Sequence, residues 1–176
     1  TLQSLGAKTT LVSGPTSLTR PNVERVINVD SADQMLEACE SSLPADIAVC
    51  AAAVADYKIA NKEITKIKKD GSRQNMILEE NPDILERLSK RNHLRPKLVV
   101  GFAAETSNLE RNSDEKLNKK GCDWVLGNNV SENSIFNQDT NKIYFTSKLY
   151  SENWELMTKK EVAKKLCQKI SLHLNN

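Results

Sequence analysis

Residues 47–57 read Ile-Ala-Val-Cys-Ala-Ala-Ala-Val-Ala-Asp-Tyr. The segment 47–55 is an unbroken series of small and β-branched apolar residues, which predicts a buried parallel strand that runs into a loop. Small side chains at Ala51 and Ala52 would let a flat ligand approach the backbone, although they could equally serve close helix packing. Asp56 is the only charge in this run, so we expect it to have a partner or a task.

Strand and helix patterns alternate on both sides of this run. Short apolar or alternating segments predict strands at 9–13, 26–29, 98–102 and 124–126, and an edge strand at 141–146. Amphipathic or capped segments predict helices at 31–40, 108–120 and 159–174, and a further helix that starts at 81. We therefore expect an α/β domain with a mostly parallel sheet flanked by helices, and ligands beyond the carboxyl ends of its strands.

Asn81-Pro82-Asp83 predicts a helix start with Asn81 at the cap, Pro82 at the first helical position and Asp83 near the positive end of the dipole. The free N–H groups of such a start suit an anion, although an ordinary cap is the alternative. The segment 101–106 places Phe102 and an acid at a strand end, where the ring could stack on a base or simply join the core.

Two groups of lysines could either bind phosphate groups or be ordinary solvated surface residues. Lys66, Lys68 and Lys69 begin a segment, 66–78, that predicts an extended hairpin arm with an apolar end. Lys116 and Lys120 are four residues apart, so they lie on one face of their helix and repel each other mildly. Together with Lys66 they would suit a triphosphate, whereas solvated surface lysines are the alternative. The apolar end of the arm is expected to pack on a second subunit.

Composition narrows the class of protein. The 176 residues suffice for one domain, and a net charge of +2 gives no argument for nucleic acid or an anionic membrane. No apolar stretch approaches the roughly 20 residues that cross a bilayer. Four widely spaced cysteines without a CxxC pair favour free thiols in a reducing cytoplasm. Thr1 is not an initiator, and 2–7 is typical of a last helical turn capped by Gly6, so we expect a fragment.

The order of the motifs along the chain is more specific than any single motif. They are Ser13-Gly14-Pro15, Ala51 to Tyr57, Lys66-Ile67-Lys68-Lys69, Asn81-Pro82-Asp83-Ile84-Leu85, Gly101-Phe102-Ala103-Ala104-Glu105-Thr106, Lys116-Leu117 with Lys120-Gly121, and Asn128-Asn129-Val130. This ordered set resembles the phosphopantothenoylcysteine synthetase family, in bacteria usually the C-terminal half of a bifunctional flavoprotein. The resemblance implies a Rossmann-like fold, a homodimer and CTP as the nucleotide. Flavin would belong only to an upstream decarboxylase domain.

The resemblance also implies a nucleotide site. Its residues are Cys50, Ala51, Ala52, Asp56, Lys66, Asn81, Pro82, Asp83, Ile84, Phe102, Lys116 and Lys120, with Lys66 in a catalytic role. The family pattern further includes an N-terminal strand with a glycine-containing phosphate loop, which is missing from residues 1–176.

The implied reaction joins 4'-phosphopantothenate to cysteine in coenzyme A biosynthesis. CTP converts the carboxylate to an acyl-cytidylate and releases pyrophosphate, after which the amine of cysteine displaces CMP. Lysines and Mg²⁺ would offset the negative charges, with the metal held mainly by phosphate oxygens and water. The alternative is a non-catalytic or dehydrogenase-like Rossmann nucleotide-binding module, but Ser13-Gly14-Pro15 ends a strand without the acidic residue that a dehydrogenase uses for ribose.

Overall fold

The computed structural model describes residues 1–61, 68, 71, 75–130 and 140–175. The strands are β1 (Thr10–Ser13), β2 (Arg25–Asn28), β3 (Ile47–Cys50), β4 (Tyr57–Ile59), β5 (Leu78–Glu80), β6 (Leu98–Glu105), β7 (Trp124–Asn129), β8 (Thr140–Ser147) and β9 (Ser151–Thr158). The helices are the 3₁₀ turn η1 (Gln3–Leu5), α1 (Ala32–Ser41), α2 (Ile84–Ser89), α3 (Leu109–Lys120) and α4 (Lys159–Leu174). The predicted helices are therefore all present.

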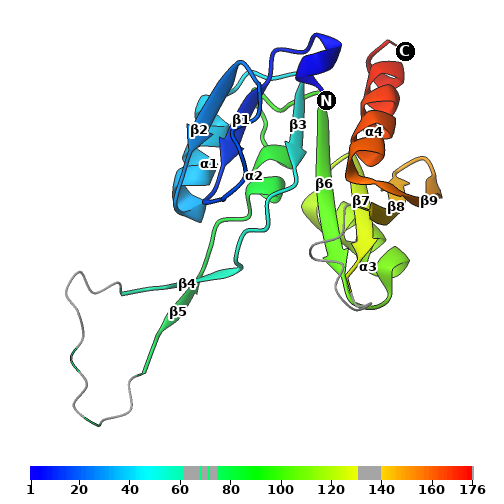
Figure 1. Ribbon diagram of the computed structural model, residues 1–176. Helices are drawn as coiled ribbons and strands as arrows, with labels where there is room; N and C mark the ends of the chain where they lie inside the picture. Colours follow the sequence, from blue (N-terminus) through cyan, green and yellow to red (C-terminus); the bar gives the residue numbers. More distant parts are fainter. Residues whose placement is uncertain (62–67, 69–70, 72–74, 131–139, 176) are drawn as a thin grey trace.

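A five-stranded sheet has the order β3-β6-β7-β8-β9, and β1, β2 and α1 lie beyond its β3 edge (Figure 1). Strands β3, β6 and β7 are parallel, and β8 and β9 extend them in antiparallel fashion. The predicted α/β class is confirmed, with helices flanking a sheet that contains parallel strands. The parallel strands direct their carboxyl ends to one edge of the sheet, where ligand sites form in such folds.

Helices cover both faces of this sheet. On one face α4 packs on a core of alternate strand residues that includes Leu126, Phe145 and Trp154. On the other face α2 and α3 pack on Val99, Ala103 and neighbouring side chains. No described helix is both long and apolar enough to cross a membrane.

Gly101 allows α2 to lie close to β6. A Cβ atom built at Gly101 would lie 2.6 Å from Cδ2 of Leu85, so a larger residue would require the Leu85 side chain to move. This close approach holds the start of α2 beside the carboxyl ends of β3 and β6.

Strands β1 and β2 form a separate two-stranded parallel sheet. It shares an apolar cluster with α1, α2 and β3, to which Val12, Met35 and Leu88 contribute. The predicted cap of α1 is confirmed, because Ser31 Oγ accepts a hydrogen bond from Gln34 N at 3.2 Å. The predicted Gly6 cap is also present, although it closes a 3₁₀ turn.

Two strands differ from their predictions. The run 47–55 was expected to be buried, but β3 is the edge of its sheet and Val49 remains 38% exposed. Conversely, 141–146 was expected at an edge, but β8 is an interior strand because β9 pairs with it. No strand was predicted at 151–158, where β9 lies with Trp154 fully buried.

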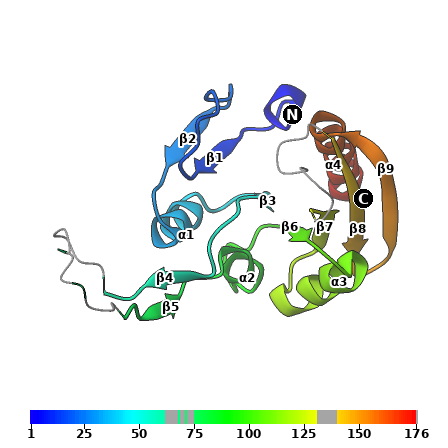
Figure 2. The ribbon, with the colours of Figure 1, turned by 60° about the horizontal axis from the view of Figure 1, so that its bottom comes forward.

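The base of the predicted arm is an antiparallel hairpin. Strand β4 pairs with β5, and Ala60 N donates to Ile77 O at 2.9 Å. The hairpin projects from the side of α1 and α2, as Figures 1 and 2 show. Lys66 and Lys69, with 62–67, 69–70 and 72–74, lie outside the described residues.

Candidate functional site

One residue, Asn81, joins the loop after β3 to the segment that leads into α2. Asn81 Nδ2 donates to the carbonyl of Ala55, and Asn81 N donates to the carbonyl of Asp56, both at 2.8 Å. Ala51 and Ala52 in this loop are exposed, so their backbone is accessible. The two segments predicted to read a nucleotide base are therefore held side by side.

The cap of α2 differs from the prediction. Asp83, and not Asn81, is the N-cap, and its Oδ1 accepts a hydrogen bond from Glu86 N at 2.8 Å. Pro82 consequently precedes the helix, and Ile84 is its first residue. The physical reason is that the amide of Asn81 is already used on Ala55, whereas the carboxylate of Asp83 can reach the free N–H groups of the first turn.

Lys120 on α3 forms an ion pair with this capping residue. Lys120 Nζ contacts Asp83 Oδ2 and lies 3.8 Å from Glu86 Oε2, and its side chain is only 18% exposed. The hydrogen bond with Asp83 raises the pKa of Lys120, with smaller contributions from Glu86 and Asp56. Partial burial acts to raise the pKa of Asp83, but the ammonium of Lys120 and the N–H of Glu86 outweigh it and the net shift is downward.

Lys116 lies one turn earlier on the same face of α3, as the spacing predicted. Its Nζ donates to the carbonyl of Phe102 on β6 at 2.7 Å, and its charge also lowers the pKa of Asp83. The two ammonium groups are thus held near the carboxyl ends of β3 and β6. Both have partners within the described chain, so an anionic ligand would have to compete with these contacts.

An open groove of about 580 Å³ runs along this face of α3. Its lining residues are Glu105, Asn112, Glu115, Lys116, Asn118, Lys119 and Lys120. The groove joins the two predicted lysines to the end of β6. It therefore lies where ligand sites form in such folds, and its lining carries both lysines and glutamates.

Three other predicted residues have different surroundings. The ring of Phe102 packs against the core on the α4 face, so its backbone carbonyl and not its ring contacts Lys116. The carboxylate of Asp56 is exposed and makes no ion pair within the described residues. Burial, with smaller effects from neighbouring groups, raises the pKa of the Cys50 thiol to about 12, so this residue is not an activated nucleophile.

The sequence model of the family described as "DNA/pantothenate metabolism flavoprotein C-terminal domain" matches residues 1–173. The chain belongs to this family. The match confirms the family expected from the ordered motifs.

Two relatives are similar to this chain over most of its length. The coenzyme A biosynthesis bifunctional protein CoaBC of Haemophilus influenzae is 38% identical over 166 residues, which cover 94% of this chain and 41% of that protein. A cysteine/cysteine sulfinic acid decarboxylase from an unknown prokaryotic organism is 37% identical over 172 residues, covering 95% and 47%. The chain thus spans less than half the length of either relative.

A crystal structure of the C-terminal domain of a CoaBC protein has the same fold. It is 31% identical in sequence, superimposes with a TM-score of 0.78, and the match covers 99% of this chain and 78% of that one. The fold of the family domain is therefore the fold described above.

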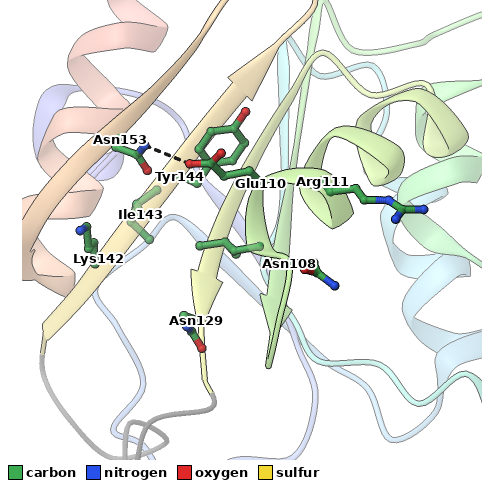
Figure 3. Close-up of a pocket in the computed structure, with 9 residues that line it drawn as sticks. Asn108, Glu110, Arg111, Asn129, Lys142, Ile143, Tyr144 and Asn153 are labelled. Carbon is green, nitrogen blue, oxygen red and sulfur yellow. Dashed lines mark hydrogen bonds between the residues drawn. The ribbon is translucent and has the colours of Figure 1, made fainter.

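A second pocket of about 510 Å³ lies on the other side of α3 (Figure 3). It is lined by Asn108, Leu109, Glu110, Arg111, Asn129, Lys142, Ile143, Tyr144 and Asn153. None of the predicted site residues is among them. Asn153 Nδ2 donates to Glu110 Oε1 at 3.2 Å across this pocket, and Arg111 points away from it. The groove beside α2, which contains Lys116 and Lys120, is therefore the better candidate in this family domain.

Lys66, predicted to be catalytic, lies outside the described residues. Within the described ranges, no group of three or more His, Cys, Asp or Glu side chains could hold a metal ion. Sequence reasoning missed Glu105 and Asn112, which line the groove of the family domain together with the lysines. Glu105 was visible as the acid that follows a predicted strand, but its partner Asn112 gave no signal.

Proposed function

We propose that this domain ligates 4'-phosphopantothenate to cysteine with CTP, through an acyl-cytidylate, in coenzyme A biosynthesis. The observation that carries the proposal is the convergence of three parts: the loop held by Asn81, the capped start of α2, and the lysine face of α3. The reaction brings a carboxylate together with a triphosphate, so its site needs cations close to an open backbone that can read a base. The similarity to the CoaBC protein of Haemophilus influenzae also supports the proposal, because 38% of the residues are identical over 94% of this chain.

In this proposal the lysines bind the triphosphate and the backbone after β3 binds the base. Lys116 and Lys120, with Lys66 from the arm, would bind the triphosphate and stabilise the charge that develops as pyrophosphate leaves. The exposed backbone at Ala51 and Ala52 and the start of α2 would hydrogen-bond to the edge of cytosine. Mg²⁺ would enter with CTP, held mainly by phosphate oxygens and water.

Two assembly features belong to the proposal. The exposed apolar residues of the hairpin, Met76, Ile77 and Leu78, would pack against a second copy of the chain in a homodimer. Among the described residues β1 and β3 each have one unpaired edge, and one additional parallel strand of the domain would lie between them. The shared apolar cluster that joins Val12 on β1 to Cys50 on β3 supports this, because these two strands are not hydrogen-bonded to each other. A chain extended toward the N-terminus should accordingly resist urea better than residues 1–176.

The function is tested by pyrophosphate release from the full-length protein supplied with CTP, phosphopantothenate and Mg²⁺. Release should need phosphopantothenate, should fall strongly when ATP replaces CTP, and should yield an amide once cysteine is added. Equal affinity for ATP and CTP by calorimetry would contradict the proposed base readout. Release of CO₂ from cysteine without use of a nucleotide would instead align this protein with its relative named as a cysteine decarboxylase.

The role of Lys66 is tested in the same assay. Lys66→Gln should slow pyrophosphate release by about 10²–10³-fold, as the loss of one donor to developing charge does, while the melting temperature stays near that of the wild type. Lys69→Gln is the neighbouring control and should remain active. Normal turnover of Lys66→Gln would mean that Lys66 has no catalytic role and is an ordinary solvated lysine.

A further inference from the structure

Glu105 ends strand β6 at the edge of the sheet where the groove opens. Its backbone is fixed, because it pairs with Asn129 on β7 and its carbonyl accepts a hydrogen bond from Val130 N at 2.8 Å. Its side chain is oriented as well. Asn112 Nδ2 donates to Glu105 Oε2 at 2.8 Å and also to the carbonyl of Ser107 at 3.1 Å. The half-buried carboxylate is therefore held in one place from two elements.

No cation pairs with this carboxylate in the part of the chain that the structure describes. Within the described residues Glu105 forms no ion pair, because Lys116 binds the carbonyl of Phe102 and Lys120 binds Asp83. Glu115, in the same groove, differs in this respect, since its Oε1 accepts a hydrogen bond from Arg111 Nε at 2.8 Å. Glu105 thus presents to the groove an oriented negative charge that no described side chain neutralises.

A carboxylate at this position would oppose a bound nucleotide unless it served a positive group. Glu105 and the two lysines line one groove, so it faces the same space as the proposed acyl-cytidylate. Among the reactants of the proposed ligation, the amino acid is the one that carries an organic cation, its α-ammonium group. We propose that Glu105 is a catalytic residue of the second half-reaction, which binds the α-ammonium of the amino acid and accepts a proton from it, with Asn112 as its positioning residue.

The chemistry balances. An ammonium nitrogen has no free electron pair, so one proton passes from it to the Glu105 carboxylate before attack. The neutral amine then forms a C–N bond with the acyl carbon, and the C–O bond to the phosphate breaks with its electron pair leaving on CMP. The nitrogen loses its second proton to water, which gives the amide, and Glu105 releases its own proton to solvent. No oxidant or further co-reactant is required.

This assignment of Glu105 rests on the proposed ligase function. The two can be tested separately, because pyrophosphate release reports the first half-reaction and amide formation reports the second. Glu105→Gln in the full-length protein should keep CTP-dependent and phosphopantothenate-dependent pyrophosphate release within about twofold of the wild type. Its kcat/KM for cysteine should fall by about 10²-fold or more, the usual contribution of a general base. Asn112→Ala should raise KM for cysteine and lower kcat less than Glu105→Gln does. Glu155→Gln, at an exposed position of β9 that does not line the groove, is the control and should behave as the wild type.

Hydroxylamine gives the decisive comparison. It is largely uncharged at neutral pH, so its attack on the acyl-cytidylate needs neither an ammonium site nor a base. Hydroxamate formation by Glu105→Gln should therefore proceed at the wild-type rate, although amide formation with cysteine is slow. If Glu105→Gln does not fold, Glu105→Asp, which withdraws the carboxylate by one methylene, should show the same selective loss.

Three results would overturn the assignment. Normal use of cysteine by Glu105→Gln would remove the residue from the reaction. An equal loss with hydroxylamine and cysteine would make its role structural. A loss of pyrophosphate release that extra Mg²⁺ restores would assign Glu105 to the nucleotide step. If the wild type itself releases no pyrophosphate from CTP, the proposed function fails, and the inference fails with it.

Discussion

Lys120 on α3 contacts the carboxylate of Asp83, the residue that caps α2. This ion pair fixes two elements of the candidate site against each other. It also sets a condition on ligand binding, because a triphosphate that uses Lys120 must compete with Asp83 or bind beside the pair. Lys116, whose partner is the neutral carbonyl of Phe102, is the easier of the two to recruit.

Replacement of Lys120 by Met should lower the free energy of unfolding by about 1 kcal/mol, because it leaves the partly buried carboxylate of Asp83 without its cation. The pKa of Asp83 is depressed in the native state, so this stabilisation exists above the ordinary carboxyl pKa and is lost as the pH falls through the native value. Urea unfolding should therefore show a wild-type advantage at pH 7 that shrinks under strongly acidic conditions. The exposed neighbour Lys119→Met should show neither effect.

The thiols of Cys50 and Cys122 should resist alkylation in the native protein. Burial raises their pKa values to about 12 and about 11, from an ordinary 9.0. At pH 8 native Cys50 should hold about a thousandfold less thiolate than an ordinary cysteine. Mass spectrometry after iodoacetamide should find both cysteines unmodified in the native state and labelled in urea. Because the native state retains these protons above pH 9, its stability should fall as the pH rises from there.

Local rules were sufficient for most of the fold. The helix α3 begins after Asn108 and ends at Gly121 as predicted, because a left-handed glycine closes it. The last helix has its predicted bounds for a similar reason. Thr158 and Glu161 form a capping box, and Val162, Leu166 and Ile170 form one buried stripe. These signals lie within a few residues of each other, where sequence patterns are informative.

The missed features depend on contacts between distant segments. Strand β9 carries several charged and polar residues, so no strand was predicted there, and its pairing with β8 could not be read locally. The shift of the α2 cap from Asn81 to Asp83 depends on the carbonyl of Ala55, which is 26 residues away. In the site, the sequence spacing placed Lys116 and Lys120 on one helix face. It could not show that Lys116 binds the carbonyl of Phe102 or that Lys120 binds Asp83.

The hairpin predicts the oligomeric state. Met76 is 69% exposed and Ile77 is 65% exposed, and a two-stranded hairpin cannot bury such side chains by itself. We expect the full-length protein to be a dimer at micromolar concentration, and Met76→Lys with Ile77→Asp to shift it to a monomer without unfolding it. Light scattering and circular dichroism give the two measurements. Leu149→Lys, at a turn residue that is 90% exposed, is the control and should leave the dimer intact. A wild-type monomer would contradict the arm as an interface.

Packing of α3 on β7 gives the last prediction. A Cβ atom at Gly127 would lie 2.2 Å from Ser113 Oγ and 2.8 Å from Leu109 Cδ1. Gly127→Ala should therefore destabilise the protein by about 1–3 kcal/mol, the usual cost of overpacking. Ser113 Oγ is buried without a hydrogen-bond partner in the described part of the chain. Ser113→Ala should accordingly be neutral or stabilise by up to about 1 kcal/mol.

The two changes should also be coupled. Ser113→Ala removes the atom at 2.2 Å and leaves the flexible tip of Leu109 as the main obstacle, which a rotamer change can relieve. In the double variant Gly127→Ala should therefore cost at least about 1 kcal/mol less than it does alone. A double-mutant cycle by urea unfolding measures this difference. Additive effects would mean that the helix backbone, and not the serine hydroxyl, sets how closely α3 approaches β7.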